Sequence, residues 1–181
     1  MEPIQNLNKH NDILRYLNEM PRKMMMLHGR DNIAAFLLHD LCHEQGFNLH
    51  KGAYIVDNAD FDCLKGVAGI HRLEHAKYAN GNGSTIWHTP DDYSAFCSDT
   101  DFNKRVRSIE HKSIERSKGD EARMIHELAE QLHIEKPEYY SWPIKHYNKG
   151  ILLFERADEQ SKELDEHILN SIHLFSFCPI A

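Results

Sequence analysis

Long hydrophobic runs are absent from this sequence. No apolar stretch approaches the roughly 18 residues that a membrane-spanning helix needs, so we expect no membrane partner. The first residues also lack the basic start and apolar core that mark a signal peptide, which favours a cytoplasmic protein.

Cysteine is sparse as well. The four cysteines lie at positions 42, 63, 97 and 178, without CxxC spacing. A disulfide framework would need denser cysteines, and a cysteine zinc site would need paired ones. We therefore expect reduced thiols.

The sequence has no excess of positive charge. It carries 21 Lys and Arg against 28 Asp and Glu, a formal net charge of −7 at pH 7. Because a protein that binds duplex DNA or RNA is more often basic, this balance argues against a nucleic-acid partner. A small-molecule substrate or ligand is the expected partner, and the oligomeric state is left open.

The length and patterning of the 181 residues predict one α+β domain over 1–181. We expect it to be mostly helical, with a small antiparallel sheet contributed mainly by the C-terminal third. A helical portion at about 8–79 would carry a metal site, and further helices and a hairpin would fill about 90–181. Apolar spacing, caps and breakers predict helices at 8–20, 31–45, 61–79, 121–133 and 158–170. A further helix is expected to start near Pro90 and to break near residue 98, and another to start near residue 99 and to end at about 116. Strands are expected at 52–56, 85–88, 139–142, 144–147, 151–154 and 173–178.

Histidine, by contrast, is abundant, with 14 residues. Since the unperturbed imidazole pKa is about 6.5, the net charge should rise steeply between about pH 7 and pH 6. The same residues are a stock of metal ligands and acid–base groups.

The strongest local pattern is the polar end of an otherwise apolar predicted helix, with His39, Asp40, His43 and Glu44. Residues three and four apart are neighbours on a helix, so His39 and His43 can chelate one divalent ion. Asp40 is either a third ligand or an acceptor that orients an imidazole. Glu44 is the candidate general base for a metal-bound water. The alternative is that this is the ordinary polar end of an amphipathic helix, where histidine interacts well with the helix dipole.

A second histidine pair lies in the predicted helix 61–79. His71 and His75 are four apart beside Glu74, and they continue an apolar stripe that includes Leu64 and Ala68. Either neighbouring protein groups or water satisfy these histidines, or the two predicted helices pack together and share one metal through His39, His43 and His71 or His75.

The stretch from Ala34 to Glu44 resembles the signature of the HD-domain metal-dependent phosphohydrolases, in which an apolar helix ends in a His-Asp pair that binds a divalent metal. The resemblance covers about a dozen residues and implies an all-helical fold and a phosphate-ester substrate. It would make His39 and Asp40 the central pair. It would add His10 as the upstream ligand and Asp91, Asp92 or Asp99 as the distal one.

The sequence thus predicts a metal-binding protein, a metal-dependent hydrolase of a small molecule, with His39, Asp40, His43, His71 and His75 as metal ligands and Glu44 as catalytic base. Imidazole and carboxylate ligands suit Zn, Fe, Mn or Ni. The alternative is a non-catalytic histidine-rich binding or interaction protein without a metal.

Overall fold

The computed structural model describes residues 2–27, 33–43, 46–74, 100–114, 120–157 and 165–178. Within these ranges the elements, in chain order, are α1 (Glu2–Met26), α2 (Ile33–Cys42), β1 (Leu49–Asn58), β2 (Cys63–His71), α5 (Asp101–Arg107), β3 (Glu110–His111), α7 (Glu121–Gln131), β4 (Glu138–Pro143), β5 (Lys149–Arg156), α8 (Asp165–Ile172) and the 3-10 helix η2 (His173–Phe177).

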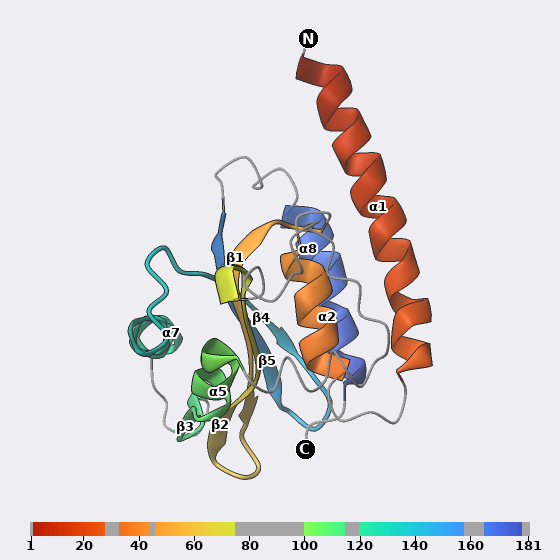
Figure 1. Cartoon of the computed structure of the whole chain (residues 1–181). Helices are drawn as coiled ribbons and strands as arrows, with labels where there is room; N and C mark the ends of the chain where they lie inside the picture. Colours follow the sequence, from red (N-terminus) through yellow and green to blue (C-terminus); the bar gives the residue numbers. More distant parts are fainter. Residues whose placement is uncertain are drawn as a thin grey trace.

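The strands of the described part form one antiparallel sheet in the order β3-β2-β1-β5-β4. Helices α2 and α8 cover one face of this sheet, α5 and α7 cover the other, and α1 lies outside α2 (Figure 1). The predicted combination of helices and an antiparallel sheet is therefore confirmed.

A hydrophobic core fills the space on each side of the sheet, and alternate residues of β1 point into each one. Tyr54 and Val56 belong to the core beneath α1, α2 and α8, whereas Ala53 and Ile55 belong to the core beneath α5 and α7. A strand covered on both faces needs apolar residues at successive positions, not at every second one. This explains the continuous apolar run at 53–56.

The predicted location of the sheet was wrong. β1 and β2 come from the first half of the chain, and β1 lies at the centre of the sheet between β2 and β5. The expected helix 61–79 was wrong over 63–71, where the chain forms β2. Gly66 and Gly69 disfavour a helix by about 1 kcal/mol each. They also allow α5 to approach, because a Cβ atom at either position would collide with Val106.

Other boundaries also differ from expectation. The first helix continues through Pro21 to Met26, since Met20 and Leu27 on either side are buried in the core. The expected strand 173–178 is the 3-10 helix η2, the segment 144–147 is a turn after β4, and the helix expected to reach 116 ends at Arg107. The strand expected at 85–88, the helix expected near Pro90 and residues 158–164 of the helix expected at 158–170 lie outside the described residues.

The described cysteines are free thiols in different environments. Cys42 and Cys178 are buried, and Cys63 is partly exposed. Burial raises the pKa of Cys178 to about 12 and raises that of Cys42 further, so neither forms the reactive thiolate at neutral pH. We expect iodoacetamide to alkylate Cys63 in the native protein, and Cys42 and Cys178 only after unfolding. Peptide mass spectrometry of native and urea-unfolded samples checks this order, and early labelling of Cys42 would contradict it.

Candidate functional site

Helix α2 carries His39, and His43 follows directly after its end. Eight of its ten residues are buried, and it packs against β1 and β2. His39 lies in its last turn and His43 directly after it, with the amide of His43 donating to the His39 carbonyl at 3.0 Å. The two ring centroids are 5.9 Å apart at an interplanar angle of 41°. Both rings are therefore within reach of one common ligand.

The turn after α2 depends on a glycine. A Cβ atom at Gly46 would lie 2.5 Å from the carbonyl oxygen of Asp40 and 3.0 Å from that of Leu41. The backbone then folds over the helix end, where Phe47 donates to Leu41 at 2.9 Å and Asn48 donates to His43 at 3.0 Å. This tight closure fixes the end of α2 that carries the two histidines.

Asp40 is the centre of a small charged cluster. The residue is 4% exposed, and its carboxylate accepts a hydrogen bond from Lys23 Nζ at 2.9 Å and faces His39 Nδ1 at 3.5 Å. Burial raises the pKa of Asp40, but the hydrogen bonds from His39 and Lys23 outweigh it and hold the pKa below its ordinary value. Asp40 is therefore an ionised carboxylate that joins α1 to α2 and contacts one candidate imidazole.

The structure does not bring His71 to this cluster. Ile70 points into the core beneath α2, so its neighbour His71 points to the opposite face of β2, where its ring lies 5.9 Å from that of Phe102 on α5. The sheet separates His71 from His39 and His43, and the expected packing of two helices around one shared ion does not occur for His71.

Other predicted site residues fall outside what the structure describes. These are Glu44, His75, Asp91, Asp92, Asp99 and the side chain of His10. Among the residues that are described, no group of three or more His, Cys, Asp and Glu side chains is placed to hold a metal ion.

Two residues that contact the candidate site residues could not be predicted from the sequence. Lys23 is 17 positions from Asp40, and nothing in the local pattern of either residue signals their ion pair. His50 lies with its ring centroid 5.1 Å from that of His71, although the two are far apart in sequence and His50 follows no histidine spacing. Both pairings depend on tertiary packing.

Comparison of the chain with protein-family models, with curated proteins and with solved structures gave no match. The likeness to HD-domain phosphohydrolases therefore stays a prediction. Across the described residues, no helix combines the length and the apolar character needed to cross a membrane.

Proposed function

We propose that the His39–His43 pair binds a divalent transition-metal ion and that the protein is a metal-dependent hydrolase of a small molecule. The observation that supports this is the arrangement on α2, with two imidazole rings 5.9 Å apart and a buried carboxylate behind one of them. A carboxylate that holds one ring nitrogen of a histidine is a common support for metal ligation by the other.

Asp40 takes the supporting role in this proposal. Its Oδ2 atom is occupied by Lys23 at 2.9 Å, while Oδ1 faces His39. An ammonium group next to the carboxylate opposes a second positive charge at the same oxygen, so Asp40 orients His39 and the two imidazoles supply the ligands. This differs from the HD-like arrangement, in which the aspartate would itself be a ligand.

The chemistry would come from the metal and from the carboxylate that follows His43 in the sequence. A bound divalent ion lowers the pKa of a water molecule and so supplies a nucleophile near neutral pH. Glu44, next to His43 in sequence, is the proposed base that accepts the proton. A phosphate ester is the proposed substrate, on the sequence resemblance.

Metal titration tests the proposal. Protein without a His-tag should bind one equivalent of Zn²⁺, Mn²⁺ or Fe²⁺ at α2, and a ligand at 100 times its Kd raises the free energy of unfolding by about 2.7 kcal/mol. His39→Ala and His43→Ala should each remove one bound equivalent together with the stabilisation it provides, and Asp40→Asn should weaken binding at α2 about 10- to 100-fold. His126→Ala, an exposed histidine on α7, is the matched control and should bind as the wild type does.

The assay for activity is release of phosphate from a chromogenic phosphate monoester in the presence of each metal. Loss of turnover in His39→Ala, with retention in His126→Ala, is the expected pattern. If His39→Ala and His43→Ala bind as many equivalents of every tested metal as the wild type, with unchanged affinities, the α2 site is wrong. The non-catalytic alternative would then stand.

A further inference from the structure

A second histidine pair lies on the opposite face of the sheet from α2. His50 of β1 and His71 of β2 have ring centroids 5.1 Å apart with the rings nearly perpendicular, at 86°. The two strands pair antiparallel here, with Lys51 opposite His71. We call these two residues the His50–His71 pair.

An irregularity in β1 occurs at the position of His50. The pairing of β1 with β5 shifts between Leu49 and Lys51, and Asn48 just before it has a φ of 53°, in the left-handed region. The Asn48 side chain accepts a hydrogen bond from Arg72, next to His71. Bulges and strained backbone positions of this kind re-aim side chains and concentrate at functional sites. The bulge here lies where His50 meets His71.

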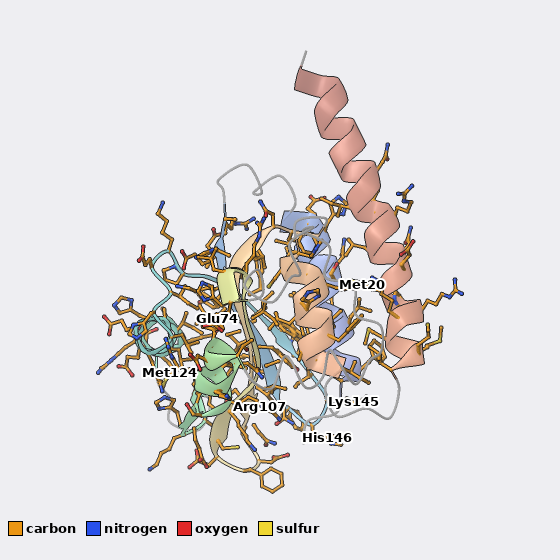
Figure 2. All side chains as sticks on the ribbon, viewed as in Figure 1. Met20, Glu74, Arg107, Met124, Lys145 and His146 are labelled. Carbon is orange, nitrogen blue, oxygen red and sulfur yellow. The ribbon has the colours of Figure 1, made fainter. Side chains whose placement is uncertain are left out.

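Glu74 contacts the His71 ring at its Nδ1 atom. Its Oε1 atom lies 3.5 Å from His71 Nδ1, and its Oε2 atom accepts a hydrogen bond from the backbone amide of Phe102 at 3.1 Å. Figure 2 shows Glu74 just beyond the end of β2, near the start of α5. A carboxylate facing Nδ1 favours the tautomer with the proton on that nitrogen. The lone pair is then on Nε2.

Nε2 of His71 is buried and has no hydrogen-bond partner within the described residues. A buried polar nitrogen without a partner is costly, and a bound water, ion or ligand is a usual explanation. Burial lowers the pKa of His71, although Glu74 raises it. The nearby Lys51 ammonium is paired with Glu155 at 3.6 Å, which reduces its repulsion of a cation.

We propose that the His50–His71 pair binds a divalent transition-metal ion such as Zn²⁺ through Nε2 of His71 and a ring nitrogen of His50, with Glu74 orienting His71. Neutral imidazoles favour Zn²⁺, Ni²⁺ and Cu²⁺ over Mg²⁺ and Ca²⁺. Two protein ligands leave the remaining coordination positions to water or a small anionic ligand. This site is independent of the α2 site, because the sheet lies between them.

The experiment begins with the His39→Ala/His43→Ala double variant, which removes the α2 pair and keeps the second site. Calorimetric titration with Zn²⁺ should still show about one equivalent bound. Substoichiometric Cu²⁺ should broaden the imidazole NMR signals of His50 and His71 before those of exposed histidines such as His126. Calorimetry that detects no binding, or broadening that starts elsewhere, overturns the proposal.

Further substitutions in the His39→Ala/His43→Ala variant distinguish the proposed metal ligand, His71, from the residue that orients it, Glu74. His71→Phe should abolish binding, and Glu74→Gln should weaken it about 10- to 100-fold, as expected for a residue behind a metal-bound histidine. His126→Gln is the control and should change nothing. Because Glu74 also contacts α5, circular dichroism and melting temperature establish that each variant is folded. A folded His71→Phe protein that binds Zn²⁺ like its parent overturns the proposal, whatever the outcome at α2.

Discussion

Replacing Lys23 by Met is expected to lower the free energy of unfolding by about 2–3 kcal/mol. The substitution leaves the carboxylate of Asp40 with one fewer partner, and that side chain is only 6% exposed. Breaking a fully buried ion pair costs about 3–5 kcal/mol, because an unpaired charge remains out of water. The loss here is smaller, since the Lys23 side chain is itself 33% exposed and His39 still faces the carboxylate. Urea denaturation followed by circular dichroism measures the change.

An exposed pair provides the control for Lys23→Met. Arg123 and Glu127 are an i, i+4 pair at 3.0 Å on the surface of α7, and Arg123→Met should cost no more than about 0.5 kcal/mol. The double variant Lys23→Met/Asp40→Leu should recover much of the lost stability, because it removes the buried charge as well. Equal effects of Lys23→Met and Arg123→Met would mean that Asp40 does not depend on Lys23.

Replacing Gly66 by Ala is expected to destabilise the protein by about 3 kcal/mol, the upper end of the ordinary range for overpacking. The added Cβ atom would lie 1.8 Å from the backbone carbonyl oxygen of Val106 at the end of α5. A backbone atom cannot rotate away as a side chain does, so α5 must move off β2. The hydrogen bond from the Gly66 amide to the Ile109 carbonyl, 3.3 Å long, would be strained in the same step.

Gly52 on β1 is the matched control for Gly66. A Cβ atom there would meet Cys42 Sγ at 2.8 Å and Leu38 Cδ1 at 3.2 Å, and both are side-chain atoms that can shift. Gly52→Ala should therefore cost about 1 kcal/mol. Thermal and urea unfolding of both variants test the contrast. If Gly66→Ala is the milder substitution, the close packing of α5 on β2 is wrong.

The elements that the sequence predicted well have strong local signals. The helix expected at 121–133 is α7, where Asp120 caps the first turn by accepting from the Ala122 amide at 3.0 Å. The apolar run at 151–154 lies in β5 and the strand expected at 139–142 lies in β4; the two form a hairpin, although its turn includes the residues 144–147 that were expected to be a strand. Helix α2 ends at Cys42, before the expected end at 45, but the expected glycine stop lies close behind it: a Cβ atom at Gly46 would lie 2.5 Å from the Asp40 carbonyl oxygen.

The errors arise where a local pattern is compatible with two structures. Leu64 and Ala68 are four apart, which fits one face of a helix and also one face of a regular strand. In the structure a bulge between Tyr54 and Ile55 in the pairing of β1 with β2 breaks that alternation, so Leu64 and Ala68 lie in different cores. The contacts that decide between the two structures are the pairing with β1, the preceding strand, and the packing against α5, which is distant in sequence.

In the candidate site, too, contacts within one helix could be predicted from the sequence, and contacts between helices could not. His39, Asp40 and His43 are neighbours because they share one helix end, which the sequence predicts. Lys23 reaches Asp40 only because α1 packs beside α2. The spacing of residues along the chain does not predict such a contact.

The two oxygens of Asp40 couple two parts of the molecule. Oδ2 holds Lys23 of α1 and Oδ1 faces His39, so the attachment of α1 and the orientation of the imidazole draw on one carboxylate. Coupling free energies are reciprocal: if binding at His39 changed the free energy of the Lys23–Asp40 contact, loss of that contact would change the binding free energy at His39 by the same amount. A ligand that fixes His39 would therefore change how firmly α1 is held against the domain, and a partner that displaces α1 would change the affinity for that ligand.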